Sequence, residues 1–189
     1  ITLEFAFYNA KYSDVVNTNV VYDSTSGLPT TQFQSTGALA IMGFQAGATY
    51  RIDNYSIYAN FTYTNPKDDI SGARIGDIAV SSFNAGMNAV LFDDLNISLR
   101  SNYVGSKETG KTTTVKGNPM SSIDGYFLLS GTVSYFNIIE SGISLQLICN
   151  NILNTEYYDP GVRSADNLIY ASQIPQNERN LTMRMILDF

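Results

Sequence analysis

Apolar and polar residues alternate along several stretches of this chain, which is the pattern of a β-strand with two different faces. The last stretch shows it best: apolar residues occupy every second position from Leu181 to Phe189, and only Ile186 breaks the polar set between them. The sequence therefore predicts about eight strands. They fall within residues 3–7, 44–51, 55–64, 84–91, 95–103, 129–135, 143–150 and 180–189.

The predicted connections between these strands alternate between short and long. Residues 53–54, 93–94 and 140–142 carry Asp, Asn, Ser and Gly, which favour tight turns. The other connections are long polar stretches at 65–77, 106–125 and 159–178, and a further loop is expected at 24–29 within the less clear segment 9–31. Bacterial membrane barrels place short turns on the periplasmic side and long loops outside. If Phe189 marks a periplasmic end, every long stretch falls outside.

Composition favours a membrane barrel over a soluble β-sandwich, whose strands also alternate apolar and polar residues. Only 15% of the residues are charged, and the mean hydropathy is −0.06. A sandwich usually exposes a polar face rich in Lys and Glu. Here the polar positions carry mostly Ser, Thr, Asn, Gln and Gly. No run approaches the roughly 18 apolar residues of a transmembrane helix. The fold class expected is all-β, an antiparallel transmembrane β-barrel.

Aromatic residues make up 12% of the chain and gather near the predicted strand ends. At such positions a ring can lie at the level of the lipid headgroups while a hydroxyl stays in water. The residues assigned to this girdle are Tyr50, Tyr55, Tyr63, Phe92, Tyr103, Tyr126, Tyr157 and Phe189.

Charge and residue usage exclude several function classes. The net charge of −6 argues against a nucleic-acid partner, which requires clustered Lys and Arg. The chain has no His, so the usual general base of a hydrolase is missing, and an outer-membrane protease or lipase is the least favoured alternative. The single Cys149 offers neither a disulfide nor a metal motif. We expect no enzyme, no cofactor and no metal site; Asp68–Asp69 is expected to be a solvated loop pair.

Two segments near the C-terminus carry a family resemblance. SLQLICNNILNTEYYDPG, residues 144–161, resembles the penultimate-strand signature of TonB-dependent outer-membrane receptors, with Leu153 where the family has Phe and with Tyr157 at its Tyr position. IPQNERNLTMRMILDF, residues 174–189, is similar to the family's closing strand, although Glu178 stands where the family often has Gly. LNISLRSNYVGSKETG, residues 95–110, resembles the strand that ends in Tyr-Val-Gly.

The resemblance implies a 22-stranded barrel with a plugged lumen. Residues 1–189 are then expected to be its C-terminal part, about the last third, without the plug domain and the TonB box. It also implies location in the outer membrane of a Gram-negative bacterium and TonB-dependent uptake of a scarce nutrient such as a ferric siderophore, haem or cobalamin. The implied partners are outer-membrane lipid, a small metal chelate, TonB through the plug, and the barrel assembly machinery. The alternative is a complete eight-stranded barrel that acts as an anchor, adhesin or resistance protein.

Candidate site residues follow from this placement. Tyr157, Tyr158 and Arg163 could meet a ligand at the barrel mouth, or the two tyrosines could belong to the girdle. The charged side chains expected in the lumen could pair with acids on the plug or contact an anionic chelate. These are Arg51, Arg100 and Arg184. The resemblance marks Phe189 as a terminal aromatic recognised during assembly, so deletion of Phe189 is expected to impair insertion.

Overall fold

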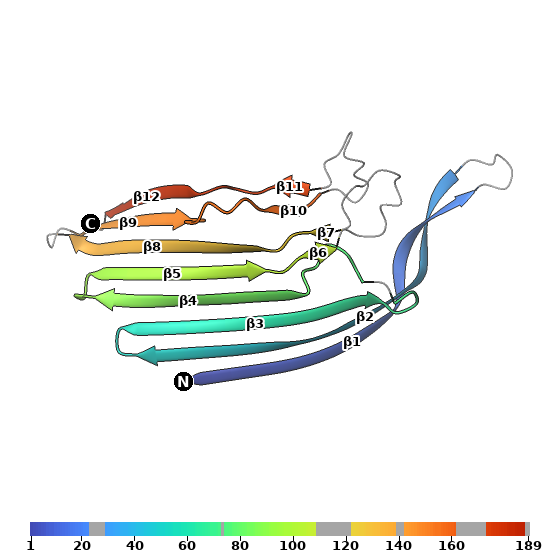
Figure 1. The fold of residues 1–189 in the computed structure, drawn as a ribbon, viewed down its shortest axis with the longest axis horizontal. Coiled ribbons are helices and arrows are strands. Elements are labelled where there is room, and N and C mark those ends of the chain that lie inside the picture. Colours follow the sequence, from blue (N-terminus) through green and yellow to red (C-terminus); the bar gives the residue numbers. More distant parts are fainter. Residues whose placement is uncertain (23–28, 73, 109–121, 139–141, 162–172, 188–189) are drawn as a thin grey trace.

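The computed structural model describes residues 1–22, 29–72, 74–108, 122–138, 142–161 and 173–187. They form one antiparallel sheet of eight strands in which each strand pairs with the next along the chain (Figure 1). The strands are β1 (Thr2–Tyr22), β2 (Pro29–Ile52), β3 (Tyr55–Asp68), β4 (Ser81–Leu91), β5 (Leu95–Val104), β8 (Tyr126–Ile138), β9 (Ile143–Asn150) and β12 (Asn180–Leu187). The predicted number and order of strands are confirmed.

Short and long connections lie at opposite ends of the sheet, as predicted (Figure 1). The turn end holds the start of β1, the end of β12 and the turns at 53–54 and 92–94. Asp53, Phe92 and Asp93 have φ values of 46°, 52° and 62° there. Such left-handed residues match the twist of a tight hairpin. Of the turn expected at 140–142, only Gly142 is described. The opposite end, which holds the long connections, is called the loop end below.

Strands β1 and β2 are longer than the sequence predicted. They have 21 and 24 residues, whereas a membrane strand needs about 9–11. Pairing of β2 with β3 begins only at Leu39, so the outer halves of β1 and β2 pair with each other alone and project beyond the loop end (Figure 1). A bulge at Asp14, with φ 57°, shifts the register between Tyr12 and Val15 and hides the alternation. Most of the loop expected at 24–29 lies outside the described residues.

The expected outer loops also contain regular structure. Strand β3 continues to Asp68, into the stretch predicted as a loop. Two short hairpins stand at the loop end: β6 (Lys107–Glu108) pairs with β7 (Ser122–Ile123), and β10 (Tyr158–Pro160) pairs with β11 (Gln173–Pro175). These pairs are too short to show a period of two, so composition alone could not reveal them.

The register separates an apolar face from a polar face. One row of Cα partners on the apolar face crosses seven strands, and an aromatic row lies closer to the loop end. Both rows suit the lipid-facing surface of a barrel and its interfacial girdle. The apolar row is Ile52, Tyr55, Ala89, Ile97, Val133, Leu147 and Met183, and the aromatic row includes Phe61, Phe83, Tyr103 and Phe127.

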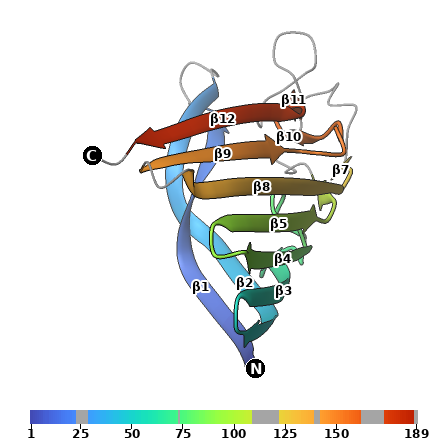
Figure 2. The same cartoon turned by 90° about the vertical axis from the view of Figure 1, so that its left-hand side faces the viewer.

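The sheet is a single curved layer, as Figure 2 shows. Within the described residues the only buried hydrophobic side chains are Ala89 and Ile123, apart from the prolyl ring of Pro66, whereas Phe5 is 78% exposed. A soluble sandwich would cover this face with a second sheet. Among the described residues no helix is long and apolar enough to span a membrane. Strands β1 and β12 each pair on one side only, and every residue of β12 is exposed.

Candidate functional site

The polar face of the sheet is rich in uncharged hydrogen-bonding side chains. One row of Cα partners crosses seven strands and contains a single charge. Its side chains also bond to one another, since the Ser98 hydroxyl donates to Asn88 Oδ1 over 2.5 Å. A face of this kind suits a water-filled or plugged lumen. The row is Arg51, Ser56, Asn88, Ser98, Thr132, Ile148 and Thr182.

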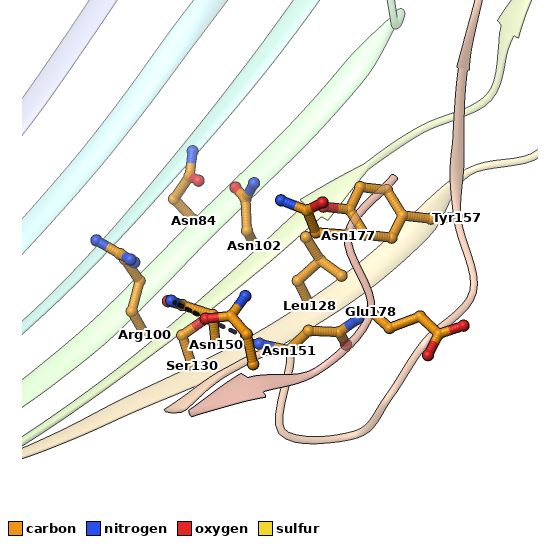
Figure 3. Close-up of a pocket in the computed structure, with 11 residues that line it drawn as sticks. Asn84, Arg100, Asn102, Leu128, Ser130, Asn150, Asn151, Tyr157, Asn177 and Glu178 are labelled. Atoms are coloured by element: carbon orange, nitrogen blue, oxygen red, sulfur yellow. Dashed lines mark hydrogen bonds between the residues drawn. The ribbon is translucent and has the colours of Figure 1, made fainter. Parts of the chain in front are cut away.

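A recess of about 480 Å³ is hollowed into this face toward the loop end (Figure 3). Strands β4, β5, β8, β9 and β12 supply its wall, and the segments flanking β10 and β11 close one side. Asparagine is the dominant residue type among its described lining residues, and Arg100 and Glu178 are the only charged ones among them. The lining residues are Asn84, Arg100, Asn102, Leu128, Ser130, Asn150, Asn151, Tyr157, Asn177, Glu178 and Asn180.

Asn151 builds the turn that brings the chain from β9 back over the recess. It has φ 51° and is 4% exposed. Its side chain holds the backbone of Thr155 twice: the Thr155 amide donates to Asn151 Oδ1, and Asn151 Nδ2 donates to the Thr155 carbonyl, both over 2.9 Å. Asn154 Oδ1 accepts a bond of 3.0 Å from the Arg179 amide. These bonds fix the segments that carry Tyr157 and Glu178.

Tyr157 packs on Tyr126 at the edge of the recess nearest the loop end. The ring centroids are 4.5 Å apart, and the Lys107 ammonium lies 5.6 Å from the Tyr126 ring centroid. The same ammonium pairs with the Asp159 carboxylate, and the Lys107 side chain is only 14% exposed. Both aromatic rings therefore take part in a loop-end cluster. The girdle prediction is wrong for Tyr126, because its Cα partner Val104 aligns with Ser82 on the polar face.

Three ion pairs connect successive loop-end segments. Lys11 of β1 pairs with Asp69 after β3, and Arg74 of the same connection pairs with Glu108 of β6. Lys107 then joins β6 to Asp159 of β10. The Asp77 amide also donates to the Glu108 carbonyl over 2.7 Å. Strand β1 and the described parts of three connections are thus tied together in sequence order at the loop end.

The three arginines predicted to face the lumen all lie on the polar face, but they are not clustered. They belong to β2, β5 and β12, with two strands between each one and the next in the sheet order. At about 4.8 Å per strand, each is roughly 14 Å from the next across the sheet. Within the described residues none has an acidic partner. Arg100 lines the recess, whereas Arg51 and Arg184 do not.

The mouth residues predicted from the sequence separate in the structure. Tyr157 lines the recess, whereas Tyr158 belongs to β10 and pairs there with Pro175. Arg163 and Phe189 lie outside the described residues. The sequence analysis did not identify Asn84 of β4 and Asn102 of β5 as site residues, and the structure makes them Cα partners. The recurrence of Asn at polar positions of adjacent strands is the sequence signal that could have identified them.

The acidic pair at the end of β3 has two separate roles. Asp68, beyond the aromatic girdle, accepts hydrogen bonds from the amides of Ser71 (2.6 Å) and Ile70 (3.1 Å). The bonds from Ser71 are the main reason that the pKa of the Asp68 carboxyl lies below its ordinary value. Asp69 instead pairs with Lys11. Within the described chain no group of three or more His, Cys, Asp or Glu side chains could hold a metal.

A single curved sheet with one lipid-type face, one polar face and loops at one end defines part of the wall of a transmembrane β-barrel. The family model for the TonB dependent receptor-like β-barrel matches residues 1–152. The chain belongs to this family, whose members are outer-membrane transport receptors of Gram-negative bacteria. No curated protein sequence matches it.

Solved receptor structures share the fold at low sequence identity. The ferric enterobactin receptor PfeA from Pseudomonas aeruginosa is 15% identical, with a TM-score of 0.78, over 99% of this chain and 29% of its own. The ferripyoverdine receptor of the same organism is 17% identical, with a TM-score of 0.75, over 99% and 25%. The import receptor Fiu from E. coli K12 is 15% identical, with a TM-score of 0.73, over 97% and 24%. The chain thus spans about a quarter of each.

Proposed function

We propose that residues 1–189 are the C-terminal part of the barrel of an outer-membrane receptor that takes up a scarce nutrient by TonB-dependent transport. The nutrient class is a small metal-containing compound such as a ferric siderophore, haem or cobalamin. The observation that carries the proposal is the open eight-stranded sheet, with an apolar row on one face and a hydrogen-bonding recess on the other. Family membership supports the same conclusion.

The open edges support a place within a larger wall. In hydrocarbon each unpaired backbone amide is destabilising by several kcal/mol, so a membrane sheet must close or continue. The described residues of β1 and β12 pair with β2 and β9 and not with each other. The coverage of about a quarter of each related receptor agrees with this.

The remaining parts of the transport cycle are assigned to partners. A plug domain within the lumen would transmit energy from TonB, and it would meet the polar face that carries Arg51, Arg100 and Arg184. Lipid would contact the apolar face, and the assembly machinery would recognise the terminal Phe189. The ligand would enter from the loop end, past Tyr157.

Uptake by the complete receptor tests the proposal. A strain in which the gene has been deleted should fail to take up one of a defined set of labelled ferric siderophores, haem or cobalamin. The complete gene should restore uptake, and a tonB deletion should abolish the restored uptake. Restored uptake that persists without TonB, or no uptake defect for any of these compounds, would contradict the proposal.

A complete small barrel of this chain alone is the competing outcome, because eight strands suffice for the smallest membrane barrels. The isolated 189-residue chain, refolded in detergent, would then migrate as a compact heat-modifiable monomer. Our proposal predicts that it does not, and that the reading frame upstream of Ile1 encodes further strands and a plug.

A further inference from the structure

We propose that residues 30–35 of β2 form an edge to which an extended, uncharged segment of an extracellular protein adds as a further antiparallel strand. These residues are called the free edge below. Together with residues 16–21 of β1 they form the outer hairpin, which projects beyond the loop end (Figure 1). The inference goes beyond the proposed uptake function, because it concerns a protein partner and not the transported nutrient.

The free edge has a strand on one side only. In the described part of the chain, residues 30–35 pair with residues 16–21 of β1 and with no other strand. Pairing of β2 with β3 begins at Leu39, and the Asp69 amide donates to the Ala38 carbonyl over 2.9 Å where β3 leaves β2. In an antiparallel strand every second residue directs its N–H and C=O groups away from the first partner. The free edge therefore presents such groups to an added strand that follows the line of β3.

The composition of the outer hairpin leaves this edge unprotected. Its residues are Val, Asn, Thr, Gln, Phe and Ser, with no charged residue and no proline among them. Proteins usually protect a free strand edge with charge, proline or a bulge. Here Pro29 and the two register shifts flank the regular pairs and do not interrupt them. The outer hairpin offers no opposite charge to a partner, so an uncharged segment of high β propensity fits it best.

The outer hairpin also exposes apolar side chains on one face. Phe33 is 76% exposed and Val16 is 63% exposed. Val16 pairs with Ser35 and Thr18 pairs with Phe33, so the two apolar residues are diagonal neighbours on the same face. A two-stranded hairpin is marginally stable in water, and a third strand is what makes such a sheet stable. An added strand would supply these hydrogen bonds and would cover Phe33 with one of its side chains.

The membrane setting favours a separate protein over a second copy of this chain. The outer edge of β1 continues the edge at which the proposed barrel wall carries on, so the site is assigned to β2. Two receptors in one membrane have the same orientation, so their β2 strands would run parallel, which is the less stable form of pairing. A segment of an extracellular protein is free to approach antiparallel to β2, as in other cases of strand addition.

Binding of a strand-forming peptide to the complete detergent-solubilised receptor tests the inference. The probe is the fluorescently labelled peptide VVNTNVVY, which copies residues 15–22 and is uncharged in its side chains. Fluorescence anisotropy should show saturable binding. The same peptide with proline at its two central positions should bind at least about tenfold more weakly, because adjacent prolines remove a donor from each edge. Phe33→Ser in the receptor should weaken binding by about two- to fivefold through the lost cross-strand contact. Absence of saturable binding would overturn the inference.

Disulfide formation with the bound peptide locates the edge. Gln34→Cys and Asn17→Cys, each in a Cys149→Ser background, are a matched pair, because Gln34 and Asn17 are Cα partners. A strand added to β2 lies about 5 Å from β2 and about 10 Å from β1, and a disulfide needs Cα atoms within about 7 Å. Peptides with a cysteine at either central position should therefore couple to residue 34 at least about tenfold faster than to residue 17. Equal rates, or faster coupling to residue 17, would overturn the inference.

Two further measurements separate the other ways in which the edge could be occupied. A disulfide between Val21→Cys and Thr30→Cys, which are Cα partners, locks the outer hairpin. The peptide should still bind, whereas loss of binding would mean that it replaces β1 and would overturn the inference. Sedimentation of the complete receptor without peptide should show a monomer. A dimer that the peptide dissociates would assign the edge to a second copy and would also overturn it. TonB-dependent uptake is measured separately, so these outcomes leave the proposed function intact.

Discussion

The ring of Tyr58 lies across Gly86 on the neighbouring strand of the polar face, where the two residues are Cα partners. A Cβ atom on Gly86 would come within 2.6 Å of Tyr58 Cε1, and the next closest atoms also belong to the Tyr58 side chain. The glycine therefore provides the space in which the tyrosine lies flat against the wall, as an aromatic side chain covering a strand glycine.

Gly86→Ala should lower the free energy of unfolding by about 1–2 kcal/mol, because the Tyr58 ring must move. Tyr58→Ala should remove most of this penalty in the double variant. At Gly43 the added Cβ would meet the backbone carbonyl of Tyr63 as well as the Tyr8 ring. Tyr8→Ala should therefore not rescue Gly43→Ala. Urea unfolding of the receptor in lipid vesicles measures the free energy of unfolding of both sets of variants. Equal rescue at Gly86 and Gly43 would contradict the contacts described for the two glycines.

Replacement of Asn151 tests the turn that closes the recess. Asn151→Ala removes both hydrogen bonds to Thr155 and leaves half-buried backbone groups unpaired, so the free energy of unfolding should fall by about 1–2 kcal/mol. Asn151→Gly retains the left-handed φ and isolates the loss of the bonds. Asn154→Ala, which loses one exposed bond to Arg179, is the milder control. A larger effect at residue 154 than at residue 151 would refute this account.

Double-mutant cycles should distinguish the ion pairs of the loop end. Lys107→Met with Asp159→Asn should give a coupling energy of about 1 kcal/mol, since the Lys107 side chain is largely buried although Asp159 is partly exposed. Lys11→Met with Asp69→Asn should give about 0–0.5 kcal/mol, because both side chains are exposed. Thermal unfolding of the four variants in each cycle provides the measurement. The reverse order would contradict the burial argument.

The stability of the turn at Asp68 should depend on pH in the acid range. The folded-state pKa of this carboxyl lies below its ordinary value, chiefly because Ser71 donates to the carboxylate. The stabilisation is thus present above the unfolded-state pKa of about 3.9 and is lost as the pH falls through the lower folded-state value. Amide exchange at Ser71 should accelerate in that range. In Asp68→Asn the acceleration should disappear, and an unchanged pH dependence would count against the proposed contact.

The sheet and its two ends were predictable from the sequence, because a period of two and the turn residues at 53–54 and 93–94 are local signals. The length of β1 was not predictable, since the two register shifts around Asp14 and Val15 interrupt the pairing midway. Nor was the recess, because the strand register and the turn at Asn151 bring Asn102 and Asn177 together from distant parts of the chain. Tyr126 was misplaced because it stands next to Phe127, and one residue changes the face.

Assembly provides a further test at the end of the chain. Deletion of Phe189 should reduce the amount of receptor in the outer membrane without changing the ligand Kd of the fraction that inserts. Quantitative blotting of membrane fractions measures the first quantity, and calorimetry measures the second. Normal insertion of the shortened receptor would remove the role assigned to Phe189.

The most direct test of the central claim compares two neighbouring residues of β12 in the complete receptor. Met183 belongs to the apolar row, and Arg184 belongs to the polar face opposite Gln146. Spin labels at Met183→Cys and Arg184→Cys, each in a Cys149→Ser background, are measured by electron paramagnetic resonance in lipid bilayers. The label at 183 should collide mainly with oxygen dissolved in lipid, and the label at 184 should be shielded from lipid. Equal access of a water-soluble relaxation agent to both labels would contradict the assignment of this sheet to a membrane barrel wall.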